Sequence, residues 1–197
     1  ILEQGADDPQ DNFLGRVKEL AHRHGAVLIF DEIVTGFRYA LGGIQEYYGV
    51  APDLACFGKA IANGMPLSVL VGRREVMRTC EEVFFSMTFG GEALSLAAAV
   101  ATIREIREKS VISYLWEIGQ RWKESFNQLA RKMEVNVECI GHGPRTSFVF
   151  RDATGEESLE MRGLFLQETV KRGILFGGPI FMTYSHTLED IDRTLEA

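Results

Sequence analysis

The sequence predicts an α/β protein in two parts: a portion of a mostly parallel sheet domain, followed by a small α+β domain. In the first part, short apolar runs alternate with helical apolar stripes, which is typical of parallel sheets. A long helix is expected at residues 92–109, and beyond it polar and apolar residues alternate over 135–139. We therefore expect residues 1–105 to belong to a larger domain and residues 106–197 to form the small C-terminal domain.

The first part is expected to begin with strand, helix and strand. Residues 1–3 are a short apolar start, 13–24 carry a helical stripe that Gly25 can close, and 26–30 are a continuous apolar run. Such a run is expected for a parallel strand covered on both faces. Further along we expect a loop with a short helix at 35–50, strands at 54–57 and 67–72, a helix at 75–80 and a loop at 84–91.

The second part is expected to contain three helices and several strands. The helices are predicted at 113–132, at 158–172 with Gly173 as its stop, and at 188–197 with Thr187 as N-cap and Asp190 at its third position. A turn is predicted at 141–144, and strands at 147–150, 174–176 and 181–184.

The composition argues against several classes of function. The net charge is -7, from 21 basic and 28 acidic residues, which argues against nucleic acid as a partner. The three cysteines, Cys56, Cys80 and Cys139, are far apart and indicate a reducing, cytoplasmic compartment. Neither a metal-binding motif nor an apolar stretch of the roughly 18 residues of a membrane span is present, so we expect no metal and no membrane partner.

Lys59 and Asp31 are the residues to which chemistry is first assigned. Lys59 is the one charged residue in an apolar, glycine-bearing stretch, 57–66, and Asp31 follows the apolar run 26–30. The carboxyl ends of neighbouring parallel strands meet in one crevice, so both side chains can reach the same ligand. An amine in apolar surroundings can act as a nucleophile, and a carboxylate can hold a protonated ring nitrogen. This pair suits pyridoxal 5'-phosphate (PLP).

Spacing alone leaves other interpretations open. A lone lysine after a strand is usually a solvated loop residue, and an aspartate at a strand end is often a helix cap. Glu32, next to Asp31, has either a structural role or a contact with the site. Arg38 has either a substrate carboxylate or an interface ion pair as its partner, and His142 and His186 are expected to be structural or exposed.

Several ordered motifs resemble those of class III PLP-dependent aminotransferases. Residues 28–38, LIFDEIVTGFR, resemble the family's FDEV…TGFR segment, and 52–66 resemble its lysine segment. Residues 88–94, TFGGEAL, resemble its threonine loop, and 186–192 resemble the end of the glutamate-1-semialdehyde 2,1-aminomutase branch. The resemblance extends from about Ile1 to Ala197.

The resemblance implies fold type I and PLP-dependent transfer of an amino group between small molecules. Lys59 would form the Schiff base with the cofactor and then serve as acid and base. Asp31 would bind the pyridinium nitrogen, and Ile33 would pack on the ring. Thr88 would reach the cofactor phosphate of the partner subunit, which implies a homodimer with a shared active site.

The resemblance also implies that this chain is the C-terminal portion of the family's full length. The family's phosphate loop and ring-stacking aromatic come upstream of the segment matched by 28–38, and neither is found here. We therefore expect the isolated chain to bind PLP weakly and to be inactive. The alternative is a non-catalytic, truncated homologue that acts in folding, dimerisation or binding. Retention of Asp31, Lys59 and Thr88 argues against that alternative. Transaminase and aminomutase outcomes both stay open, as do the amino donor and acceptor.

Overall fold

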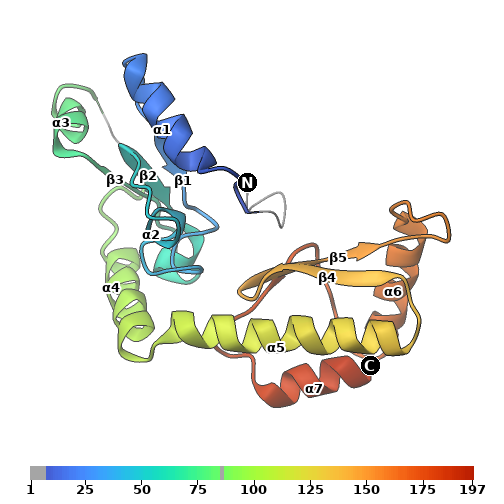
Figure 1. The fold of residues 1–197 in the computed structure, drawn as a ribbon. Helices are drawn as coiled ribbons and strands as arrows, with labels where there is room; N and C mark the ends of the chain where they lie inside the picture. Colours follow the sequence, from blue (N-terminus) through green and yellow to red (C-terminus); the bar gives the residue numbers. More distant parts are fainter. Residues whose placement is uncertain (1–7, 85–86) are drawn as a thin grey trace. The chain divides into compact units, whose positions relative to one another are not determined.

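The computed structural model of the chain describes residues 8–84 and 87–197, which divide into two units (Figure 1). Unit 1 contains the described residues up to Ile112, and unit 2 contains residues 113–197. The strand expected at residues 1–3 lies outside the described residues. Helices and strands are both present in each unit, so the α/β prediction is confirmed.

The sheet of unit 1 has three strands in the order β1 (Ile29–Asp31), β2 (Leu54–Phe57) and β3 (Val69–Gly72). Strands β1 and β2 are parallel, as expected, with Asp31 opposite Cys56. Strand β3 runs antiparallel to β2, because the short connection 58–68 has no room for the crossover that a parallel return requires. The sheet of unit 1 is therefore mixed within the described residues.

Strand β1 is shorter and more exposed than the apolar run 26–30 predicts. It begins at Ile29, whose side chain is 54% exposed, and Val27 before it is also exposed. Among the described residues β1 pairs with β2 alone. The prediction of a strand covered on both faces is therefore wrong for the part of the chain that the structure describes.

The helices of unit 1 follow the sequence pattern closely. They are α1 (Phe13–Arg23), α2 (Ile44–Tyr47), the 3₁₀ helix η1 (Lys59–Ala62), α3 (Arg74–Met77), η2 (Arg78–Glu81) and α4 (Ala93–Glu108). Gly25 takes the left-handed conformation after α1, at φ +65, as a helix stop requires. Ile61 and Ala62 of η1 pack with Ala99 of α4 and with Ala55 and Phe57 of β2, and this cluster is the core of the unit.

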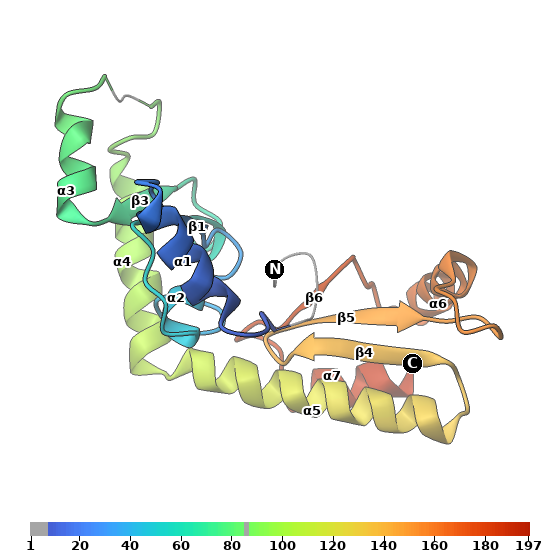
Figure 2. The same ribbon diagram turned by 45° about the horizontal axis from the view of Figure 1, so that its top comes forward.

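Unit 2 is built on the helix α5 (Val111–Lys132) and a sheet of three antiparallel strands. The strands are β4 (Val137–His142), β5 (Arg145–Phe150) and β6 (Ile180–Phe181), in that order across the sheet. The hairpin β4–β5 runs alongside α5 in both ribbon views (Figures 1 and 2). Helices α6 (Leu159–Lys171) and α7 (Leu188–Glu196) complete the unit.

Aromatic rings fill the core of unit 2. Trp122 and Phe126 of α5 lie against Phe148 of β5, with ring centroids 6.1 and 4.6 Å away. Phe165 of α6 and Phe176 contact the same cluster. Helix α5 turns an apolar stripe toward this core, with four buried members: Leu115, Ile118, Trp122 and Phe126.

Three details of unit 2 correct the sequence prediction. Strand β4 continues through His142, so the turn is confined to residues 143–144. Residues 174–176 form no strand, because the Ile174 amide donates to the carbonyl of Thr169 and closes α6. Strand β6 is shorter than the predicted 181–184 and begins one residue earlier. The Thr187–Asp190 capping box of α7 is confirmed.

Candidate cofactor site

Asp31 ends one of two neighbouring parallel strands, and Lys59 comes just after the end of the other. Asp31 is the last residue of β1 and lies opposite Cys56, and β2 ends one residue later at Phe57. Lys59 comes two residues after that end and begins η1. Since β1 and β2 are parallel, both residues lie at the carboxyl edge of the sheet, where α/β proteins bind ligands.

Lys59 has an unusual backbone and an unengaged amine. Its φ is +45, in the left-handed region that residues other than glycine seldom adopt and that is frequent at functional sites. The Nζ atom makes no hydrogen bond or ion pair with any residue in 8–84 or 87–197, and the side chain is exposed. The apolar burial that the sequence suggested for this amine is therefore not supplied by the described residues.

Ile33 connects the surroundings of Asp31 and Lys59. The Ile33 amide donates to Asp31 Oδ1 at 2.9 Å, which orients the carboxylate. A β-carbon added to Gly58 would lie 3.4 Å from Ile33 Cγ2, so the Ile33 side chain rests beside the residue that precedes Lys59. The structure thus brings together three of the four predicted site residues.

Glu32 points away from Asp31 and has a structural role. Its carboxylate is 1% exposed and accepts hydrogen bonds from the amides of Ile44 and Gln45, each at 2.9 Å, and from the Thr35 hydroxyl. It holds the start of α2 against the end of β1. A β-carbon at Gly43 would lie 2.3 Å from Glu32 Oε2, so the backbone comes close to this carboxylate. Successive residues of a strand face opposite sides, which separates the tasks of Asp31 and Glu32.

Thr88, the fourth predicted residue, lies in a turn before α4. It is exposed, and no hydrogen bond joins it to another residue of the described chain. Its neighbours Met87 and Phe89 are each 56% exposed. No hydrogen bond or ion pair joins Thr88 to Asp31, Ile33 or Lys59.

The remaining candidates have less to do with this edge of the sheet. Arg38 is half-buried, and its substrate or interface role stays a prediction. The His142 ring packs on Trp116 at 5.5 Å between centroids, and His186 Nδ1 accepts from the Thr183 amide at 3.3 Å, so both histidines have structural contacts. In the loop predicted at 84–91, the aromatic side chains of Phe84 and Phe89 are exposed, and residue 85 lies outside the described part.

Asp53 is the residue that the sequence did not single out. It is 3% exposed and binds His22, Leu28 and Arg73 with its carboxylate. In the sequence it belongs to a Pro-Asp pair at 52–53, which is typical of a turn. An aspartate directly before a predicted strand was the signal that the sequence offered. Its partners His22 and Arg73 are 31 and 20 residues away, and no spacing rule connects them to Asp53.

Comparison with known proteins places the chain in a family. The family description Aminotransferase class-III matches residues 3–193, so the chain belongs to the class III aminotransferases. It is 33% identical over 203 residues to the glutamate-1-semialdehyde 2,1-aminomutase of Akkermansia muciniphila, covering 96% of this chain and 48% of the relative. Identity to the enzyme of that name from Syntrophobacter fumaroxidans is 34%, with coverage of 96% and 47%. The chain spans about half the length of the curated relatives it matches.

Solved structures agree with this assignment. The PLP internal aldimine form of the Sphingopyxis sp. MTA144 FumI protein matches with a TM-score of 0.87 and 26% identity, over 93% of this chain and 44% of that one. A β-phenylalanine aminotransferase from Variovorax paradoxus matches with a TM-score of 0.82 and 25% identity, over 98% and 47%. The chain therefore has the fold of the corresponding part of these two proteins.

Proposed function

We propose that the full-length protein is a PLP-dependent enzyme of amino-group transfer, either a class III transaminase or an aminomutase of the glutamate-1-semialdehyde type. The observation that carries the proposal is the placement of Asp31 and Lys59 at the carboxyl ends of two adjacent parallel strands. Membership of the class III aminotransferase family supports it. The names of the relatives support both outcomes, since they include aminomutases and transaminases.

The chemistry of the side chains present at this edge fits PLP. The cofactor, when bound, supplies an electron sink for the substrate carbanion. Lys59 offers an amine without a partner among the described residues, which can bond the cofactor aldehyde and later hold and transfer a proton. Asp31 is exposed, and within the described residues its Oδ2 accepts no hydrogen bond, so the carboxylate can accept one from the ring nitrogen. Such a charge-assisted hydrogen bond is worth about 1.5–3 kcal/mol. Ile33 offers an aliphatic surface for the ring.

The proposal extends to a homodimer with a shared site. Thr88 is exposed and distant in sequence from the other three residues, as suits a phosphate contact made to a second subunit. The first turns of α4 after it carry exposed Leu94, Leu96 and Val100, and a helix that is apolar on most sides is usually covered. We assign residues 1–105 to part of the large domain and residues 106–197 to the small one.

A reducing, cytoplasmic setting is the compartment we propose. All three cysteines are free, and burial raises the pKa of the Cys139 thiol to about 11. Over the described ranges no helix has both the length and the apolarity to span a membrane, and no cluster of three or more potential metal ligands occurs.

The test uses the full-length protein with PLP. Borohydride reduction followed by peptide mass mapping should find the pyridoxyl adduct on Lys59. Lys59→Ala should abolish the adduct and turnover, whereas Lys132→Ala, an exposed lysine of α5, should leave both intact. Full turnover by Lys59→Ala would reject the proposal, whereas an unchanged protein with neither adduct nor turnover would favour a non-catalytic homologue. A requirement for an external amino acceptor distinguishes the transaminase from the aminomutase.

A further inference from the structure

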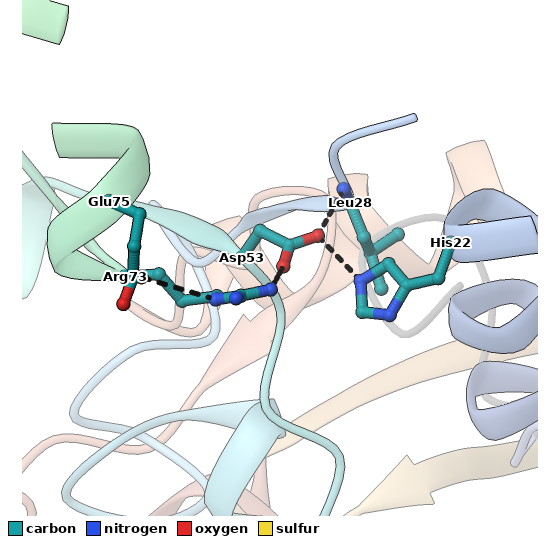
Figure 3. A network of polar contacts seen from close by, with 5 residues as sticks. All are labelled: His22, Leu28, Asp53, Arg73 and Glu75. Atoms are coloured by element: carbon teal, nitrogen blue, oxygen red, sulfur yellow. Dashed lines mark hydrogen bonds and ion pairs between the residues drawn. The ribbon is translucent and has the colours of Figure 1, made fainter. Parts of the chain in front are cut away.

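The Asp53 carboxylate joins three elements of unit 1 at the edge of the sheet opposite Asp31 and Lys59. Asp53 Oδ2 accepts from the Leu28 amide at 2.8 Å and contacts His22 Nε2 at 2.9 Å, and Asp53 Oδ1 accepts from an Arg73 guanidinium N–H at 3.0 Å (Figure 3). His22 belongs to α1, Leu28 precedes β1, and Arg73 follows β3. One buried side chain thus fixes a helix and two strands to the start of β2.

Asp53 holds two of these neighbours with main chain and side chain together. Its amide donates to the Leu28 carbonyl at 2.9 Å while its carboxylate accepts from the Leu28 amide. Its carbonyl accepts from the Arg73 amide at 2.9 Å while its carboxylate accepts from the Arg73 guanidinium. Each pair of bonds defines the register of a strand as well as its proximity, because both partners must lie directly beside Asp53.

This register decides where Asp31 lies relative to Lys59. Leu28 is three residues before Asp31, and Asp53 is three residues before Cys56, which faces Asp31 across the ladder. At about 3.3 Å per residue, Asp53 acts on the cofactor site from about 10 Å along the same two strands. A slip of one residue would turn each β1 side chain to the other face of the sheet and would turn Asp31 away.

The charge of Asp53 is part of this arrangement. The Leu28 amide, then His22 and Arg73, lower the pKa of the Asp53 carboxyl well below its usual range, so Asp53 is ionised at neutral pH. Glu75 Oε2 lies 3.6 Å from Arg73 Nε and forms a second ion pair with the guanidinium. The titratable or charged side chains that face Asp53 among the described residues are therefore His22 and Arg73, with Glu75 behind Arg73.

We propose that Asp53 is a positioning residue for the cofactor site, which fixes the register of β1 on β2 and thereby places the Asp31 carboxylate relative to Lys59. The proposal rests on the proposed function, because it assumes that these two residues hold PLP. Asp53 acts through the strands and makes no contact with the cofactor.

The test compares Asp53→Ala and Asp53→Asn with the unchanged full-length protein. The first measurement is hydrogen exchange of the amides in 28–33 and 54–59 without cofactor, and the second is the pH midpoint of the visible absorbance band of bound PLP. In Asp53→Ala, the exchange rates in both segments should rise relative to the unchanged protein, by a factor at least about ten times that seen in the rest of unit 1. The pH midpoint of the band should shift by at least about half a pH unit, because the negative charge of Asp31 has moved relative to the ring of PLP. Asp53→Asn should shift both in the same direction by less.

Ile103→Val is the matched control, because Ile103 packs on the core cluster of unit 1, to which His22, Leu28, Asp53 and Arg73 do not belong. It should lower the stability while leaving the band midpoint and the pattern of exchange unchanged. Asp53 variants that behave like this control would overturn the proposal, and Asp53→Asn decides the question if Asp53→Ala does not fold. An unchanged protein without a pyridoxyl adduct on Lys59 would instead reject the proposed function, and this inference with it.

Discussion

The side chain of Ile33 lies directly against Gly58, with room for no more than ordinary contact between Ile33 Cγ2 and a β-carbon built on the glycine. Ile33 is two residues from Asp31, and Gly58 immediately precedes Lys59. The contact therefore connects the two strand ends that carry the carboxylate and the amine. An aliphatic side chain fixed at this point can serve as a flat apolar support for a ring held between them.

Ile33→Ala should weaken PLP binding by the full-length protein about tenfold, since the loss of about 1.4 kcal/mol of apolar contact corresponds to that factor. Ile33→Val keeps the branched carbon and should weaken binding by less than about threefold. Titration of the apoprotein with PLP, followed by absorbance, measures both. Unchanged affinity in Ile33→Ala would show that this side chain does not support the ring.

Glu32→Gln should destabilise unit 1 by about 2 kcal/mol, because a buried carboxylate that accepts three hydrogen bonds would be replaced by an amide whose NH₂ faces another donor. The control is Glu46→Gln, an exposed carboxylate of α2 that accepts one bond from the Gly42 amide; it should change stability by less than about 0.5 kcal/mol. Urea unfolding of the two variants gives the comparison. Equal effects would contradict the structural role assigned to Glu32.

The placement of Lys59 and Asp31 at one edge could be predicted from the sequence, because it needs only two local patterns and the rule that parallel strand ends meet. The exposure of Ile29 could not, since burial depends on which elements cover a strand and not on its own apolar residues. The partners of Asp53 could not be predicted from the sequence either. A hydrogen bond from His22 to a residue 31 positions away leaves no periodic trace in the sequence. Such contacts follow from the packing of α1 and β3 on β2.

The pH dependence of stability should carry a contribution from Asp53. Its pKa is lowered in the folded state, by the Leu28 amide first, relative to about 3.9 in an unfolded chain. The unfolded state then binds more protons in acid, so this contribution is complete above about pH 5 and is lost as the pH falls through about 4 and below. Asp53→Asn should be less stable than the unchanged protein at neutral pH, and the difference should shrink in acid.

Urea midpoints measured between neutral pH and about pH 3 test this expectation. Glu19→Gln, at an exposed position of α1 with no ion pair among the described residues, provides the control and should run parallel to the unchanged protein. A constant difference between Asp53→Asn and the unchanged protein at every pH would show that the carboxylate charge does not stabilise the fold.

Two helical glycines of unit 2 should respond in opposite directions to the same substitution. A β-carbon at Gly119 of α5 would lie 1.9 Å from the carbonyl oxygen of Gly143, in the β4–β5 turn, so helix and turn touch backbone to backbone. A β-carbon at Gly163 of α6 would meet nothing within 4 Å. Helix propensity favours alanine at both positions by about 1 kcal/mol.

Gly163→Ala should therefore raise the stability by up to about 1 kcal/mol. In Gly119→Ala the forced separation of α5 from the turn should outweigh that gain and lower the stability by at least about 2 kcal/mol. Thermal or urea unfolding of the two variants measures the signs directly, and a stabilised Gly119→Ala would contradict the close contact between α5 and the turn.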